Sequence, residues 1–238
     1  MAVPATTGQL RERVEDMVIG DYIVWKYDST ITGYIFGGST SAYTEIAVTG
    51  HPLANMPSKY FWYAIKVDKG LLISDRVVSN TVSWDKLNSL KLIQGISITI
   101  SGNYGKLRSL TGAISYTDVN GNPRLTNNGS GFFPENSEWD KYIIGFLDEK
   151  IQVGKTLNEV FHHKENAVTW CQDVPIIGIN HPIPGGAPNP STNVARVHRG
   201  IITYSGSTAD FNFATSSWDL VWNGITQGFR PVFEYKEV

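Results

Sequence analysis

The chain has 238 residues, of which 41% are hydrophobic and 12% aromatic, so it can bury a core without disulfide or metal support. Its formal net charge is −2 and its 20 basic residues are scattered, which argues against nucleic acid as a partner. A single cysteine excludes an intrachain disulfide and a thiolate-based metal site, and the lack of a ~20-residue apolar run or a signal peptide predicts cytoplasmic synthesis without membrane insertion.

The first part of the chain predicts an arm followed by short strands. Residues 1–13 show no periodic pattern, and we expect a flexible or partner-bound arm. The longest apolar run, residues 60–67, is followed by the turn Asp68–Gly70 and by a second strand-like run over 71–78. Because Asp and Gly supply a tight reversal, these residues predict a β-hairpin.

Two helices are predicted further along the chain. Ser83 is a suitable N-cap for a connector helix that reaches Ile93. Residues 138–147 place apolar side chains at helical spacing and predict a second helix. We expect residues 14–95 to form a small β-rich module with the connector helix, and we expect Trp139, Trp170, Phe229 and Val232 to be core residues of the second half.

Four segments of the second half occur in the order of landmarks in one family. Phe133–Tyr142 resembles the helix entry of the formylglycine-generating-enzyme fold, and Ala167–Asp173 resembles the tryptophan-containing segment that follows it. Arg196–Gly200 and Gly228–Val232 are similar to its Arg-Gly-Gly and closing Gly-Phe-Arg motifs. The resemblance implies an α+β fold overall, in which the small N-terminal β-module is followed over residues 96–238 by a C-type-lectin-like (formylglycine-generating-enzyme-like) domain.

Departures from the family pattern bear on function. The enzymes carry a cysteine pair between the last two landmarks, whereas this interval contains none and Cys171 lies outside it. The tripeptides by which calcium-dependent lectins hold sugar are also missing. We therefore expect no enzymatic activity, no cofactor and no metal.

A second branch of the same fold resembles this chain in the landmarks that it keeps and in the catalytic and sugar-binding residues that it lacks. It comprises ligand-binding and tropism-determinant proteins of bacteriophages, and the segments at residues 18–23, 45–50, 66–77 and 83–88 resemble modules of phage tail-associated proteins. The resemblance implies a virion location, with residues 14–95 mounting the protein on other tail proteins. It implies a second half that binds a host cell-surface receptor, either a protein or a glycan.

The interval between Gly200 and Gly228 is the predicted ligand face. It contains no Lys or Arg and sets aromatic residues among small polar ones, a composition shared by recognition surfaces and by some cores. Because the apolar residues do not alternate, we predict a loop-rich surface between two anchored strands, with Phe211 and Phe213 held back as core. The predicted ligand-binding residues are Tyr204, Asp210, Asn212, Trp218, Asp219, Trp222 and Asn223.

Several polar residues have competing interpretations. Cys171 with His162 or His163 would suit a nucleophile and base, but a small buried hydrophobe is the favoured interpretation. Glu159 and Glu165 would add metal ligands to these histidines, although their spacing matches no established site and favours a solvated loop. We expect Glu138 and Asp140 to be first-turn carboxylates facing the helix dipole rather than a catalytic pair, and Arg199 and Arg230 to be structural donors to loop carbonyls or carboxylates.

Three functions remain open from the sequence. The first is a receptor-binding or adhesion protein of a phage tail or fibre tip, and the second is a structural tail or baseplate component without a host ligand. The third and weakest is an enzyme of the formylglycine-generating type. We expect a homo-oligomer, with a trimer as the first guess, because fibre tips of this kind depend on multivalency.

Overall fold

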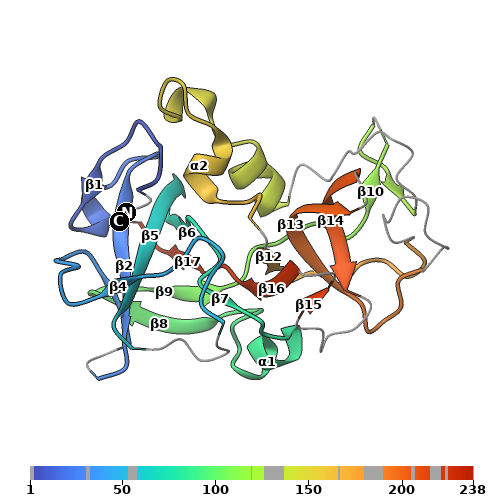
Figure 1. Ribbon diagram of the computed structural model, residues 1–238, viewed down its shortest axis with the longest axis horizontal. Coiled ribbons are helices and arrows are strands. Elements are labelled where there is room, and N and C mark those ends of the chain that lie inside the picture. Colours follow the sequence, from blue (N-terminus) through green and yellow to red (C-terminus); the bar gives the residue numbers. More distant parts are fainter. Residues whose placement is uncertain are drawn as a thin grey trace.

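Two large β-sheets, a separate two-stranded hairpin and a few short helices make up the computed structural model of the protein (Figure 1). The structure describes residues 3–30, 33–52, 58–118, 120–125, 137–165, 167–179, 190–204, 207–214, 221–222 and 225–237. For the described residues between 201 and 225, only the backbone is described. The fold is thus mostly β, which is compatible with the predicted α+β class.

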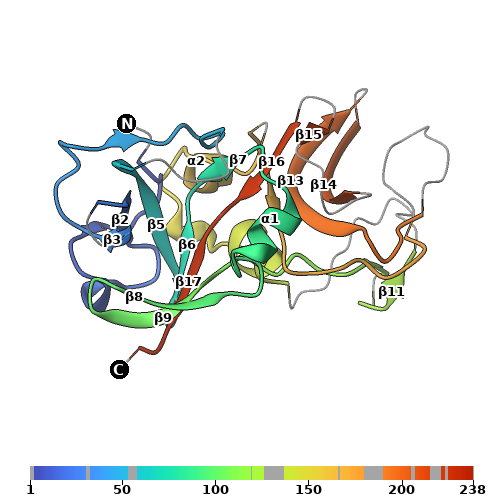
Figure 2. The same cartoon turned by 90° about the horizontal axis from the view of Figure 1, so that it is seen from below.

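The first sheet contains nine strands in a curled arrangement (Figure 2). Its main order is β1-β2-β5-β6-β17-β9-β8, while β3 pairs with β2 and β4 pairs with β5. The strands are β1 (Leu10–Arg11), β2 (Tyr22–Asp28), β3 (Gly33–Phe36), β4 (Thr44–Glu45), β5 (Tyr60–Asp68), β6 (Leu71–Ser74), β8 (Ile96–Ile100), β9 (Asn103–Arg108) and β17 (Val232–Tyr235).

The predicted hairpin is confirmed, although its second strand β6 ends earlier than expected, at Ser74. Gly70 turns the chain with φ +67°, and a Cβ there would meet the carbonyl oxygen of Tyr235 at 2.3 Å. Only glycine therefore fits between this turn and the C-terminal strand.

The C-terminal strand β17 lies between β6 and β9, where it pairs antiparallel with both. One sheet is therefore built from residues on both sides of the predicted boundary between residues 95 and 96. That boundary does not coincide with a break in the hydrogen-bonded order of this sheet.

The second sheet contains six strands, with the order β14-β13-β12-β16-β15 and β7 paired with β16. A separate two-stranded hairpin, β10 (Tyr116–Thr117) and β11 (Pro123–Arg124), contains the predicted turn that begins at Asp118. The strands of the six-stranded sheet are β7 (Ser79–Asn80), β12 (Ala167–Trp170), β13 (Arg196–Tyr204), β14 (Ser207–Ala214), β15 (Val221–Trp222) and β16 (Ile225–Phe229).

The loop-rich prediction for residues 200–228 is wrong for much of this interval. Its described residues lie in β13, β14, β15 and β16. Strand pairing across a hairpin overrides the missing apolar alternation on which the prediction depended, because backbone hydrogen bonds do not require an apolar face.

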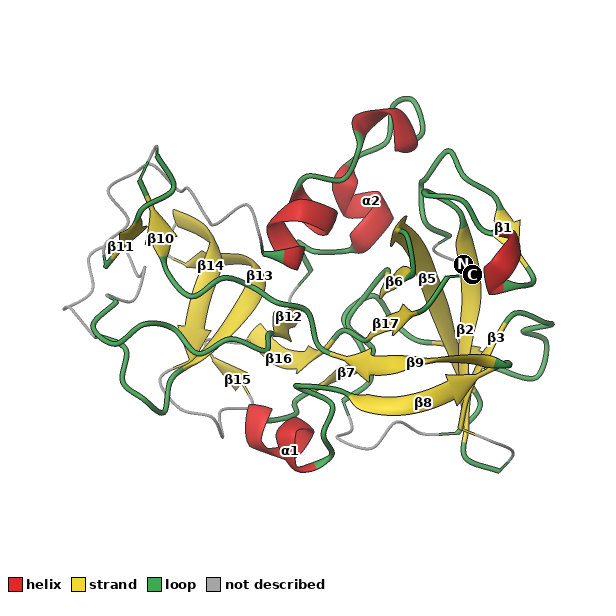
Figure 3. Cartoon of the chain, turned by 180° about the vertical axis from the view of Figure 1, so that it is seen from behind, coloured by secondary structure: helices red, strands yellow, loops and turns green. Residues whose placement is uncertain are grey.

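Short helices cover the sheets from two sides (Figure 3). Both predicted helices are present but shorter than expected: α1, which Ser83 caps by accepting a hydrogen bond from Lys86 N, ends at Ser89 rather than at Ile93, and the second is a π-helical segment over Trp139–Ile144. None of the described helices is long and apolar enough to cross a membrane. The helices are η1 (Val14–Asp16), α1 (Trp84–Ser89), η2 (Trp139–Ile144), η3 (Asp148–Lys150) and α2 (Leu157–Phe161).

The first sheet is buried on both faces, which explains the continuous apolar run of β5. Trp62 and Ala64 belong to a cluster that also contains Trp170 and Phe229 of the second sheet. Ile65 and Val67 belong to a cluster on the other side, which includes Trp139 and Val232. All four predicted core residues of the second half are at most 2% exposed, which confirms that prediction.

The predicted flexible or partner-bound arm instead packs on its own chain. Ala5 N donates to Glu159 O at 3.1 Å, Thr7 N donates to Lys150 O at 2.8 Å, and Thr6 is fully buried. Leu10 and Arg11 then pair in parallel with β2. The prediction failed because the partners of Ala5 and Thr7 lie more than a hundred residues away in the sequence.

Candidate functional site

The second sheet is fixed to the helices by a buried ion pair. Arg199, in β13, has no exposed side-chain surface, and its guanidinium donates to both carboxylate oxygens of Asp140 at 2.7 and 2.8 Å. Arg199 Nη1 also donates to Gly112 O at 2.9 Å. Asp140 lies in the first turn of η2 as predicted, and it also compensates a buried charge.

A second bidentate pair involves the other carboxylate of this turn. Glu138 accepts from Arg108 Nη1 at 2.7 Å and from Nη2 at 2.5 Å, and it also accepts from Thr111 N at 2.9 Å. Glu138 and Asp140 lie at the start of η2 as predicted, but each is held by an arginine ion pair that the prediction did not include. Each carboxylate joins the π-helical segment to a strand of one of the two sheets.

Arg230 is buried, and its guanidinium donates to neutral oxygen atoms. Its Nη1 donates to Ser74 O at 2.9 Å and to Phe161 O at 2.8 Å, and its Nε donates to Thr169 Oγ1 at 3.2 Å. Burial lowers the pKa of the Arg230 guanidinium to about 9, so the group remains cationic at neutral pH. The predicted structural role of Arg199 and Arg230 is confirmed.

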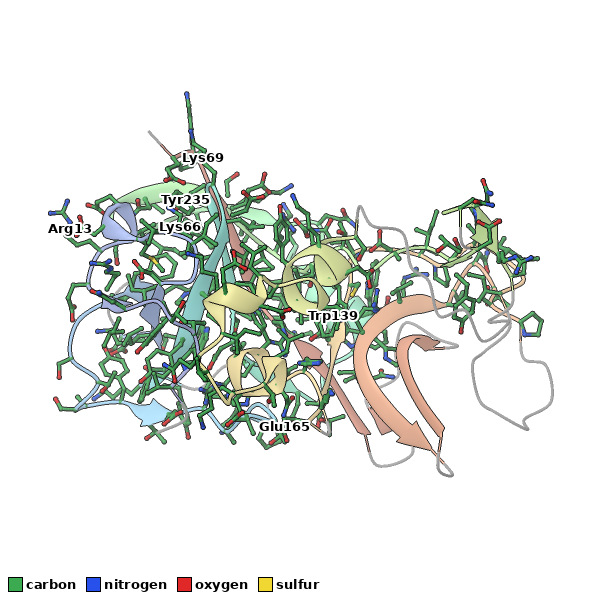
Figure 4. The ribbon with its side chains drawn as sticks, turned by 90° about the horizontal axis from the view of Figure 1, so that it is seen from above. Arg13, Lys66, Lys69, Trp139, Glu165 and Tyr235 are labelled. Atoms are coloured by element: carbon green, nitrogen blue, oxygen red, sulfur yellow. The ribbon has the colours of Figure 1, made fainter. Side chains whose placement is uncertain are left out.

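Trp139 lies between these two arginines. The guanidinium carbons of Arg199 and Arg230 are each 5.7 Å from the centroid of its ring. Figure 4 shows Trp139 where the helices meet the base of the β13–β14 hairpin. The cation–π contacts add to the ion pair in holding β13 against the π-helical segment.

The structure places four of the seven predicted ligand residues, by backbone position. Tyr204 ends β13, Asp210 and Asn212 lie in β14, and Trp222 lies in β15. Phe211 and Phe213, held back as core, are also backbone positions of β14. The remaining predicted residues, Trp218, Asp219 and Asn223, lie outside the described residues.

Strand register brings three of these positions to one face of the sheet. Asn212 pairs with His198, and Asp210 is two residues away on the same strand. Trp222 pairs with Ile225, which is two residues before Gln227 in β16. Since alternate residues share a face, positions 210, 212 and 222 belong to the face of His198 and Gln227. We name this surface the His198 face.

Two predicted positions fall on the opposite face. Phe211 pairs with Arg199, whose side chain is fixed in the buried ion pair. The register shifts between Arg199 and Ile202, so that Tyr204 pairs with Ser207. The shift places Tyr204 on the face of Phe211, and the predicted residues do not all form one surface.

The central side chains of the His198 face are mixed in character and buried, since Val168, Trp170, His198 and Gln227 are at most 2% exposed, which leaves positions 210, 212 and 222 on the outer strands β14 and β15 as the candidates for contact with a ligand. The rings of Trp170 and His198 are in edge-to-face contact at 5.7 Å, and the guanidinium of Arg196 lies 4.4 Å from the ring centroid of Trp84. Gln227 is 1% exposed, and within the described structure neither its amide nitrogen nor its amide oxygen has a hydrogen-bond partner. Buried polar groups are usually paired, so this amide marks unused hydrogen-bonding capacity on the face.

Sequence reasoning missed His198 and Gln227. His198 lies within the Arg196–Gly200 motif, which was treated as scaffold, and Gln227 is the last residue of the interval, directly before Gly228. Gln227 and Phe229 are two residues apart and share a face, so only His198 had a sequence signal, the alternation of the polar residues Arg196 and His198 with Val197. A period-two pattern of this kind indicates a strand whose alternate positions face different environments.

The competing catalytic and metal interpretations find different explanations. Cys171 is buried, and its sulfur lies 3.6 Å from Thr169 O, consistent with a small core residue. Glu159 closes a capping box with Thr156, and burial lowers the pKa of His162. His163 is also buried, which corrects the prediction of a fully solvated loop here.

We expect a chelator such as EDTA to change neither the melting temperature nor ligand binding. Among the residues that the structure describes, no group of three or more His, Cys, Asp or Glu side chains is placed to hold a metal ion. The measurement is a thermal melt and a cell-adsorption assay with and without EDTA. A loss of either property that added Ca²⁺ or Zn²⁺ restores would contradict this expectation.

A second candidate site, also missed from the sequence, is an apolar cavity of about 330 Å³ between the two sheets and α1. Tyr27 and Tyr34 form one wall, and their rings lie 5.0 Å apart. Ile96 and Ile98 of β8 form another wall. The alternation Ile-Ser-Ile-Thr-Ile over residues 96–100 was the sequence signal for this apolar surface.

Comparison with models of protein families finds no match to this chain. Curated proteins and solved structures likewise give no match.

Proposed function

We propose that this protein is a non-enzymatic component of a bacteriophage tail or fibre tip that binds a host cell-surface receptor through the His198 face. The receptor is a protein or a glycan, and the proposal names Asp210, Asn212 and Trp222 as contact residues on that face. The observation that carries it is the strand register, which brings these three independently predicted positions to one side of one sheet. The sequence resemblance supplies the phage context.

The arrangement of the molecule supports separate attachment and display ends. Both chain ends lie at one end of the molecule, and the β13–β14 hairpin lies towards the other (Figures 1 and 2). Figure 4 shows Lys66, Lys69 and Tyr235 at the end away from this hairpin. In this proposal the first sheet contacts other tail proteins, and the second sheet belongs to a C-type-lectin-like domain. The assembly is a homo-oligomer, with a trimer as the first choice.

A purely structural tail component remains the second candidate. It is favoured by exposed apolar side chains on the segments around β10 and β11, where Ile114, Leu125 and Ile177 are 44%, 46% and 71% exposed. Gly178 lies close to Leu125, so Ile177 and Leu125 are neighbours. Apolar surface of this kind is typical of contacts between proteins.

Replacing Trp218 or Trp222 by alanine is expected to weaken receptor binding by about 2–4 kcal/mol if that residue anchors the ligand, while stability changes by less than about 1 kcal/mol. The measurements are adsorption to host cells and melting temperature on the same preparations. Tyr104→Ala is the matched control, because Tyr104 is a 69% exposed aromatic residue in the first sheet.

The outcomes separate the two candidates. Selective loss of adsorption supports a receptor-binding face, whereas early unfolding of both tryptophan variants would identify them as core residues. If both variants melt and adsorb like the parent, the His198 face is not the recognition surface. Light scattering on the same samples measures the oligomeric state, and a monomer both alone and with its tail partners would contradict the proposed trimer.

A further inference from the structure

Two strand edges of the first sheet approach each other where the sheet curls. β8 is the last strand of the order, and β3 lies off the main path as a partner of β2. At one end the edges are joined by Ser101, whose hydroxyl accepts from Phe36 N at 2.9 Å and donates to Phe36 O at 3.4 Å. Within the described chain no strand ladder continues from this contact between β3 and β8.

The hairpin geometry shows which backbone groups of β8 point away from β9. Ser101 and Gly102 both have positive φ, 49° and 86°, as in a two-residue type I′ turn. Such a turn makes Ile100 and Asn103 a hydrogen-bonded pair, and their register is observed. Because hydrogen-bonded and non-bonded pairs alternate, the N–H and C=O groups of Ser97 and Thr99 point outward from the sheet edge.

The apolar cavity lies between these two edges. Tyr34 of β3 and both Ile96 and Ile98 of β8 contribute to its lining, together with Leu90 and Leu92 next to α1. Ile96 and Leu90 are 39% and 40% exposed, so the cavity reaches the surface at this rim. Its lining residues carry no formal charge. An edge with unpaired peptide groups therefore adjoins a pocket suited to uncharged apolar side chains.

We propose that an extended segment of another protein pairs with β8 along its free edge and inserts alternate apolar side chains into this cavity. Main-chain hydrogen bonds to Ser97 and Thr99 would supply affinity, and the cavity would select the side chains. The segment is uncharged at the inserted positions, because a charge would be buried there without a partner. In the proposed virion, such a segment would belong to a neighbouring tail protein, although the inference depends only on the edge and the cavity.

The geometry favours a peptide over two other occupants. A small apolar molecule would fill the cavity but leave the outward peptide groups of Ser97 and Thr99 unused. Two copies of β8 paired edge to edge would satisfy these peptide groups. However, Ile96 and Ile98 of each copy would still line the cavity of that copy, and the cavity would stay unfilled. An added strand uses both features at once.

The test uses the full-length protein and a synthetic peptide of alternating valine and threonine, with blocked ends and terminal lysines for solubility. Binding is measured by calorimetry, and protection of individual amides by hydrogen exchange. We expect the amides of Ser97 and Thr99 to become protected. We also expect a peptide N-methylated at alternate residues to bind about tenfold more weakly or worse, since it cannot donate to the edge.

Thr99→Pro is the decisive variant. It removes an outward N–H that takes no part in the β8–β9 ladder, so the free protein should keep its melting temperature while peptide affinity falls about tenfold or more. Thr99→Val is the matched control, because it keeps the N–H and should bind like the parent. If Thr99→Pro itself melts early, the N-methylated peptide on the parent protein still tests the inference.

Three results would overturn the proposal. The first is the absence of peptide binding at millimolar concentration, or equal binding of the plain and methylated peptides. The second is competition by dodecanoate without protection of the Ser97 and Thr99 amides, which would identify a small-molecule cavity. The third is a concentration-dependent dimer of the parent that Thr99→Pro abolishes, which would identify a second copy as the occupant.

Discussion

Replacing Trp170 by alanine is expected to lower the free energy of unfolding by about 3–5 kcal/mol. Trp170 has no exposed surface, and it packs in the cluster that joins β5 and β17 of the first sheet to β16 of the second. Its indole Nε1 also donates to Val82 O at 2.7 Å, so truncation leaves a buried carbonyl without this donor. Denaturant unfolding of the parent and the variant measures the difference.

Two further variants separate the causes of this loss. Trp170→Phe keeps much of the ring volume but lacks the donor to Val82, and we expect about 1–3 kcal/mol for it. Tyr104→Ala removes an exposed aromatic ring and should cost less than about 0.5 kcal/mol. A Trp170→Ala protein as stable as the parent would show that this side chain does not hold the two sheets together.

Replacing Asp140 by alanine is also expected to destabilise the protein, by about 3–5 kcal/mol. The fully buried guanidinium of Arg199 would lose both of its bonds to the carboxylate and keep its bond to Gly112 O. Leaving the buried Arg199 charge without this carboxylate costs more free energy than the ion pair contributes net. The variant therefore removes Asp140 alone and keeps Arg199. Thermal and denaturant unfolding give the magnitude.

Asp148→Ala is the matched control for this variant. Asp148 is an exposed carboxylate in the first turn of η3, and its removal should change stability by less than about 0.5 kcal/mol. Asp140→Asn keeps the shape but not the charge and should fall between the two. Equal stability of Asp140→Ala and Asp148→Ala would mean that the Arg199 ion pair does not fix the second sheet.

Local sequence patterns predicted the local parts of the fold. The turn Asp68–Gly70 between apolar runs specified the β5–β6 hairpin, and Ser83 specified the start of α1. Trp139 and Trp170 were placed in the core from the apolar and helical patterns around them. In each case the determining interactions lie within a few residues, or depend on burial that any compact fold provides to large apolar side chains.

The candidate site could be predicted only in part. Asp210, Asn212 and Trp222 were selected by composition, and the register places them on one face, whereas Tyr204 falls on the other because of a register shift. No local pattern encodes a register shift, since it depends on how two strands align after they meet. The same limit explains why the interval was predicted as loops rather than as β13 to β16.

The sequence by itself determined the hairpin, the helix start, the aromatic core and the absence of a disulfide. The tertiary structure alone decided that β17 lies between β6 and β9, and that the first residues pack against the turn at Lys150. It also decided that Asp140 neutralises Arg199, which is 59 residues away in the chain. The physical reason is that a carboxylate or a strand edge can accept many partners of the right chemistry, and only the packing of the whole chain selects one.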